Sequence, residues 1–67
     1  MSARIQRDHR RVAVLWLAGG DIMQEVLESD WPPVTHGDDD KAAREWSRIT
    51  GGITVTIRTE LQTTWRT

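Results

Sequence analysis

The side chains best suited to bind a metal ion form a short acidic cluster with a nearby histidine: Asp38, Asp39, Asp40 and His36. Carboxylate oxygens and imidazole nitrogens are ligands of divalent cations in proteins. A calcium loop of the EF-hand type, however, needs acids at alternate positions, a glycine at the sixth position and a glutamate at the twelfth. Three consecutive aspartates point in different directions. We therefore expect a solvated helix start here, with no metal site and no cofactor.

No motif in the sequence assembles a catalytic site. His9 lies among arginines, and the pattern places no nucleophile or substrate group beside it. The serines lack the strand-turn-helix context of a nucleophile elbow. The pairs Gly19-Gly20 and Gly51-Gly52 match neither the dinucleotide fingerprint nor the phosphate-binding loop, and they favour the ends of helices. We therefore expect a protein that is not an enzyme.

A basic segment near the N-terminus is the best candidate for binding nucleic acid. Its arginines are Arg4, Arg7, Arg10 and Arg11. On a helix, Arg4, Arg7 and Arg11 would share one face, and a dimer would offer that face twice to phosphate. The pI near 6.0 lacks the basic footprint of most such proteins. The competing interpretation is a solvated face, or pairing with acids of the chain's middle.

The net charge of −1 conceals a strong segregation of charge along the chain. Residues 1–11 hold four arginines against one aspartate, whereas residues 21–45 hold eight acids against two bases. Residues 46–67 are again basic, with three arginines against one glutamate. Opposite charges arranged in this way can meet within the fold or across a subunit contact.

The clearest structural signal is the alternation of residues 53–65. Every second residue lies on one, largely apolar, face: Ile53, Val55, Ile57, Thr59, Leu61, Thr63 and Trp65. The residues between them are polar, and β-branched side chains are frequent, so the pattern predicts one long strand. At about 3.3 Å per residue such a strand spans about 43 Å. A strand of that length needs a partner in a sheet.

The rest of the chain favours helices, with one ambiguity. Residues 2–18 are predicted to form a helix that ends at the first glycine pair, although residues 11–17 alone also fit a buried strand. A second helix begins at Asp21 and ends before Trp31, where two prolines follow. A third helix is expected over residues 38–49. Its apolar face consists of Ala42, Ala43, Trp46 and Ile49.

These elements predict an α+β fold for a single domain of residues 1–67. Three short helices precede one long C-terminal strand, which pairs with its copy in a homodimer through residues 53–65. A two-fold axis at Thr59 would place Arg58 opposite the second copy's Glu60. Dimerisation would support a small core that has no cysteine for disulfides. The alternative is a β-α-α-β monomer whose first and last strands pair.

For function, we expect a small non-enzymatic interaction protein that binds an unidentified partner protein. The predicted contact residues are Trp31, Trp65, Arg58 and Glu60, because Trp and Arg dominate binding hot spots. Arginine outnumbers lysine eight to one, which suggests a GC-rich genome and an accessory factor of a phage or a high-GC bacterium. The alternative is a small dimeric DNA-binding regulator that uses the N-terminal arginines.

The sequence also predicts a cytoplasmic protein. The longest apolar run, Val12–Ala18, has seven residues, well below the roughly 20 that span a bilayer. No secretory signal peptide is recognisable. We therefore expect no membrane span.

Overall fold

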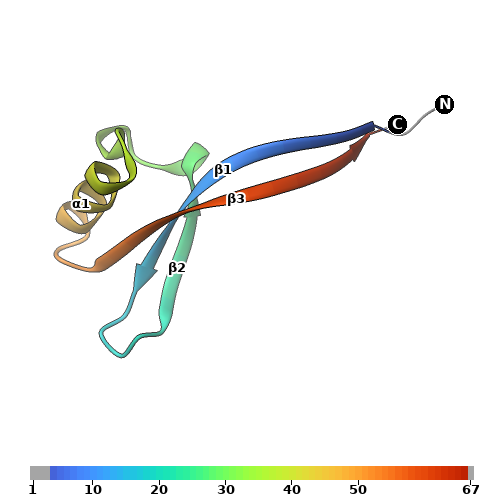
Figure 1. Ribbon diagram of the computed structural model, residues 1–67. Helices are drawn as coiled ribbons and strands as arrows, with labels where there is room; N and C mark the ends of the chain where they lie inside the picture. The colour runs from blue at the N-terminus through green and yellow to red at the C-terminus, as the bar shows by residue number, and fades with distance from the viewer. Residues whose placement is uncertain (1–3, 67) are drawn as a thin grey trace.

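Antiparallel strands dominate the fold. The computed structural model describes residues 4–66, in which three strands and one helix occur: β1 (Arg4–Trp16), β2 (Ile22–Leu27), α1 (Asp39–Ile49) and β3 (Thr54–Arg66). Two short 3-10 turns, η1 (Glu28–Asp30) and η2 (Pro33–Thr35), connect β2 to α1. The strands form one antiparallel sheet in the order β2-β1-β3, so β1 lies in the middle (Figure 1).

The predicted order of three helices and a final strand is wrong, although the α+β class is right. β1 occupies the place of the first helix, over residues 2–18, and β2 with η1 occupies the place of the second. Pairing overrides local helix propensity in both segments, because each gains a backbone ladder. β1 also buries residues 12–15, whereas β2 stays largely exposed. The alternative β-α-α-β arrangement has the right pairing of first and last strands but predicts two helices between them, where the structure has β2 and α1.

β3 pairs within its own chain, which removes the reason for a homodimer centred on Thr59. It lies antiparallel to β1 along its whole length, with Thr59 opposite Arg11 and Glu60 opposite Arg10. Arg58 contacts Glu60 of the same strand, at 3.3 Å between Nη2 and Oε2. The predicted contact across a two-fold axis is therefore a contact along one strand, and β3 needs no second copy to complete its ladder.

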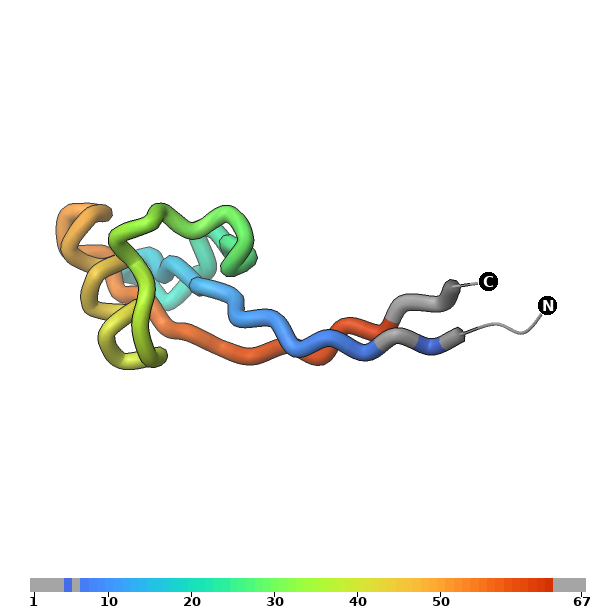
Figure 2. Tube along the Cα trace, turned by 90° about the horizontal axis from the view of Figure 1, so that it is seen from above, coloured from blue at the N-terminus to red at the C-terminus, as the bar shows by residue number. Residues whose placement is uncertain are grey.

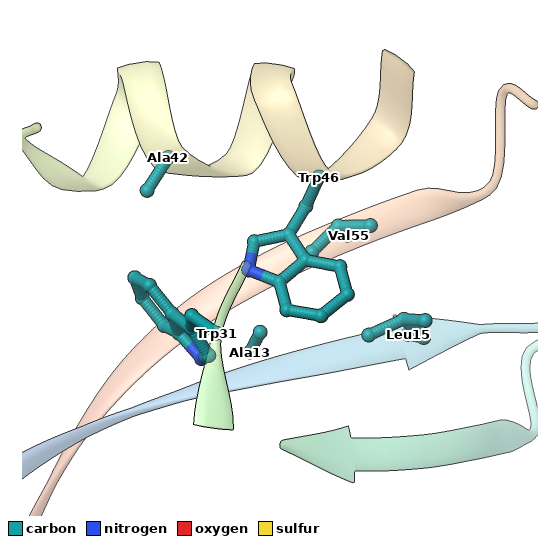
Figure 3. Packing of buried hydrophobic residues seen from close by; sticks show 6 residues of the cluster. All are labelled: Ala13, Leu15, Trp31, Ala42, Trp46 and Val55. Atoms are coloured by element: carbon teal, nitrogen blue, oxygen red, sulfur yellow. The ribbon is translucent and has the colours of Figure 1, made fainter. Parts of the chain in front are cut away.

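The core lies between α1 and the sheet face formed by β1 and β3 (Figure 3). The register places odd-numbered residues of both strands on this face. Its buried side chains are Ala13, Leu15, Trp31, Ala42, Trp46 and Val55. Trp31 and Trp46 meet edge to face, with ring centroids 6.3 Å apart and planes at 84°. The two indoles therefore join the helix and the loop before it into one core with the sheet.

The opposite face of the sheet buries two valines without help from α1. Val12 and Val14 of the central strand are each 2% exposed. Arg58 on β3 donates from Nη1 to Oε1 of Glu25 on β2, at 3.1 Å. Because β1 lies between those two strands, this ion pair crosses over the valines, and the aliphatic stems of both partners can cover them.

The third predicted helix is confirmed as α1. The Asp38 side chain caps it by accepting a hydrogen bond from the Lys41 amide at 2.8 Å. Ala42 and Trp46 are buried as predicted, whereas Ile49 is 40% exposed near the last turn.

Replacing the helix cap should weaken the fold by a measurable amount. We expect Asp38→Ala to lower the free energy of unfolding by about 1 kcal/mol, because it leaves the Lys41 amide without its acceptor. Urea unfolding followed by circular dichroism measures the change. Asp38→Ser keeps a capping oxygen and serves as the control. Equal losses in the two variants would show that the cap contributes nothing.

Beyond the core, β1 and β3 continue together as a two-stranded ribbon. We call this ribbon the arm and define it as residues 4–11 of β1 with residues 59–66 of β3. Figures 1 and 2 show its two strands running side by side, away from α1 and β2, and the last pair at its tip is Arg4 with Arg66. The molecule measures 51 × 25 × 16 Å, and the arm accounts for its long dimension.

Candidate functional site

The arm has backbone groups that no other strand satisfies in the described part of the chain. β2 pairs with β1 only from Val12 to Trp16, so the side of residues 4–11 that faces away from β3 is unpaired. We call this side the open β1 edge. In an antiparallel strand, alternate residues direct their N–H and C=O groups to either side. About half of the backbone N–H and C=O groups of residues 4–11 therefore point to the open β1 edge and are free to pair with another strand.

The side chains of the arm combine exposed apolar groups with arginines. Ile5 is 47% exposed and Leu61 is 55% exposed, and the register puts both on the face that bears the core further along the sheet. Arg7 is exposed on this same face, whereas Arg10 is exposed on the other. The arm thus offers apolar contacts on one face and a positive charge on each face.

Arg11 anchors the arm to the body. Its guanidinium donates two hydrogen bonds to Oε2 of Glu28, from Nε at 3.0 Å and from Nη2. Nη1 donates to the Gly37 carbonyl at 2.8 Å and to Oδ1 of Asp39 at 3.1 Å. The same group lies 4.9 Å from the ring centroid of Trp31, within the range of a cation–π contact. One arginine therefore connects β1 to η1, to the loop before α1 and to the core.

The hydrogen bonds from Arg11 lower the pKa of Glu28 below its ordinary value of 4.5, against a weaker opposing effect of burial. A carboxylate whose pKa is lower in the folded state than in the unfolded chain stabilises the fold. This stability is fully present when the pH is above the unfolded pKa, and it is lost as the pH falls through the folded pKa. Because the Glu28 side chain is 39% exposed, solvent screening makes the contribution modest.

We expect Glu28→Gln to make the free energy of unfolding depend less on pH below neutral. The wild-type protein should lose more stability than the variant as the pH falls from neutral to below 4.5, because only the wild type has this carboxylate to protonate. Urea midpoints at a series of pH values measure the difference. A constant difference between the two proteins over that range would contradict the assignment.

A groove lies where β2 leaves the sheet beside the arm. Its lining residues are His9 and Arg10 of β1, Leu27 at the end of β2, and Glu28 and Ser29 of η1. The chain turns away at η1, so nothing described continues β2 beside residues 4–10. The groove is thus the beginning of the open β1 edge.

The structure divides the four N-terminal arginines instead of gathering them. The single helix face predicted for Arg4, Arg7 and Arg11 does not exist, because all three lie on a strand. Arg11 pairs with acids of the chain's middle, as the competing interpretation allowed. Arg7 and Arg10 are exposed and make no ion pair with any described side chain, whereas the side chain of Arg4 lies outside the description.

The predicted contact residues also have separate places. Trp31 is 6% exposed, and its Nε1 donates to the Val26 carbonyl at 2.8 Å, so it serves the core. Arg58 and Glu60 lie on β3 and contact each other. The backbone of Trp65 belongs to the arm, but its side chain lies outside the described part. Sequence reasoning missed Ile5 and the open β1 edge, because both depend on where β2 ends.

The acidic cluster has a structural role in its described contacts. Asp38 caps α1, and Asp39 binds Arg11. Within residues 4–66 no group of three potential ligands is arranged to hold a metal ion. No described helix is long and apolar enough to cross a membrane.

Comparisons with known protein families, with curated proteins and with solved structures find no match for this chain.

Proposed function

We propose that this protein is a small non-enzymatic interaction protein that binds a partner protein through the arm. The observation that carries the proposal is the open β1 edge, a run of unpaired strand on an exposed ribbon. Exposed edges invite pairing with other chains, and proteins use them for recognition by strand addition. An accessory factor of a phage or a high-GC bacterium, the source that the excess of arginine over lysine suggests, would have such a role in binding a partner protein.

The arm adds little to the stability of the body, which favours a role in binding. An isolated two-stranded ribbon is marginally stable in water. Beyond Arg11, the large apolar side chains of the arm that the structure describes, Ile5 and Leu61, are about half exposed, so they add little to the core. An extended ribbon with exposed apolar groups gains most when another surface covers it.

Binding of nucleic acid is the second candidate, supported by the charge of the arm. The arm holds five arginines against Asp8 and Glu60, a net charge of +3, and two-stranded ribbons can enter a DNA groove. Its two exposed arginines with described side chains lie on opposite faces, which makes a single phosphate-binding surface harder to form. Retention of random duplex at low salt that weakens steeply with added salt would favour this candidate.

A homodimer through residues 53–65 stays a separate prediction. The edge of β3 that faces away from β1 has no partner in the described part of the chain, so a second copy can pair there. Light scattering across a dilution series tests it. A mass near twice 7.7 kDa that persists on dilution would support the dimer, and a constant 7.7 kDa would exclude it.

A selection from a random peptide library tests whether the arm binds protein segments. The arm variant is Arg7→Asp with Leu61→Asp. The matched control, Arg44→Asp with Ile49→Asp, makes the same kinds of change at exposed positions of α1. We expect enriched peptides to bind the wild type and the control at least about tenfold more tightly than the arm variant. Peptides that bind all three proteins equally, or no enrichment at all, would contradict the proposal.

A further inference from the structure

We propose that the open β1 edge accepts an extended acidic segment of a partner protein, which adds to the sheet as a strand in line with β2. This inference rests on the proposed function, and it names the chemistry of the partner and the way it binds. The ligand is a peptide strand with carboxylates at two set positions.

The end of β2 defines where the added strand lies. The last pair of the β1–β2 ladder is Val12 with Leu27, and η1 then turns the chain away from the sheet. The position beside residues 4–10 of β1 is therefore vacant among the described residues, and the groove at His9 and Arg10 opens onto it. A strand entering there would extend β2 toward the tip of the arm and run antiparallel to β1.

The backbone of the arm supplies the affinity for such a strand. β3 satisfies the groups on one side of residues 4–10, and the alternate groups on the other side have no strand partner in the described chain. An added strand would pair with these groups and turn the two-stranded arm into a three-stranded sheet. Three strands are also the number at which a small sheet gains independent stability.

Two arginines give the open β1 edge its preference for carboxylates. Arg7 and Arg10 are exposed, lie three residues apart and therefore project to opposite faces. Neither makes an ion pair with a described side chain, whereas Arg11 is fully engaged with Glu28 and Asp39. Opposite charges on directly paired residues of neighbouring strands attract, and like charges repel.

The same charges disfavour a second copy at this edge. Two open β1 edges placed side by side would bring together arginines in excess of their single acid, Asp8. Of the acids in residues 21–45, only Glu25 lies on a strand, and its carboxylate already pairs with Arg58. The others lie in η1, α1 and the connections, so they supply no acidic extended strand. The charge of the edge therefore favours a partner with an acidic extended segment.

The register predicts the sequence of the segment. In an antiparallel strand, positions opposite Arg10 and Arg7 are the first and fourth, and the position opposite Ile5 is the sixth. Carboxylates suit the first and fourth positions, and an apolar residue suits the sixth. The residue opposite Asp8 is the third and should be neutral. The core Glu-Thr-Thr-Glu-Thr-Val meets these requirements in a β-forming peptide.

A titration of the labelled protein with this peptide tests the inference. The probe is the core flanked by one threonine at each end, with both termini blocked. We expect amide shifts concentrated at residues 5–10 and binding that weakens about tenfold or more in the double variant Arg7→Glu with Arg10→Glu. Both residues are exposed, and circular dichroism shows whether the variant keeps the fold. A peptide with lysines in place of both glutamates should bind this variant and not the wild type.

Two altered peptides separate strand addition from general attraction of charge. The first has the same composition in scrambled order. The second carries N-methyl groups on alternate backbone amides and is made in two versions, one methylated at the odd positions and one at the even positions. We expect the scrambled peptide to bind weakly and one N-methylated version to lose binding, because an N-methylated amide cannot donate to β1. Equal binding of all these peptides, or shifts centred outside residues 5–10, would overturn the inference.

The remaining outcomes distinguish this inference from the proposed function. If the acidic peptide fails but the library still yields peptides that depend on the arm, the arm binds proteins and strand addition by an acidic segment is wrong. If neither binds, both proposals fall. Binding of a 20-base-pair duplex that depends on Arg7 and Arg10, without peptide binding, would assign the edge to nucleic acid. Self-association on concentration that protects residues 5–10 would assign it to a second copy.

Discussion

Trp46→Ala should lose roughly a third or more of the protein's free energy of unfolding. Trp46 is 6% exposed and packs edge to face against Trp31 at the centre of the core that the structure describes. Truncating a buried tryptophan costs about 3–5 kcal/mol. A chain of 67 residues has a total stability of roughly 3–10 kcal/mol at about 0.05–0.15 kcal/mol per residue. The loss is therefore roughly a third or more of the total stability, and at the low end of that range it reaches all of it.

Two further variants show whether the effect comes from the core. Ile49→Ala removes a large side chain from the same helix. Because Ile49 is 40% exposed, we expect the free energy of unfolding to fall by less than about 1 kcal/mol. Trp46→Phe keeps an aromatic ring and should cost less than alanine; it also removes an Nε1 group that has no hydrogen-bond partner among the described residues. Urea unfolding and near-ultraviolet circular dichroism measure all three. A native spectrum and transition in Trp46→Ala would show that the core is placed elsewhere.

Arg11→Ala should lower the free energy of unfolding by about 2 kcal/mol and loosen the arm. The guanidinium makes charge-assisted hydrogen bonds to Glu28, Asp39 and the Gly37 carbonyl and lies over Trp31. Hydrogen bonds to charged groups contribute about 1.5–3 kcal/mol when well buried. Here the carboxylates are partly exposed, which reduces that figure, and the aromatic contact adds about 0.5–1 kcal/mol.

The neighbouring arginine is the matched control for this prediction. Arg10 lies on the opposite face, is exposed and makes no described ion pair, so Arg10→Ala should change stability by no more than about 0.5 kcal/mol. Arg11→Lys should recover little, because an ammonium cannot reproduce the forked geometry. Amide exchange in residues 5–10 should quicken in Arg11→Ala alone. Similar losses in Arg10→Ala and Arg11→Ala would show that Arg11 has no special role.

The parts of the fold that carry their own periodicity could be predicted from the sequence. Residues 53–65 alternate along their whole length, and the structure confirms a long strand there as β3. The helix over residues 38–49 has a cap and a buried stripe, and it appears as α1. Both segments show their pattern without reference to a partner.

The first half of the chain could not be predicted in the same way, because its structure depends on pairing. In residues 4–11 the arginines mask any alternation, and residues 13–18 include good helix formers, so the local signal favours a helix. Only the match to β3 makes the segment a strand. The segregation of charge allowed a pairing of N-terminal arginines with acids of the middle, but the choice of Arg11 and its contacts with Glu28, Asp39 and Trp31 follow from the pairing of β1 with β3 and from the loops that meet there.

Amide hydrogen exchange along β1 is the measurement that tests the open β1 edge most directly. In the free protein, we expect protection to alternate through residues 5–10, because only every second amide bonds to β3, and to be nearly continuous through residues 12–16, which pair on both sides. The acidic peptide should protect the alternate amides of residues 5–10. Continuous protection of residues 5–10 without peptide would mean that this edge is already occupied. The absence of protection there would mean that the arm does not form.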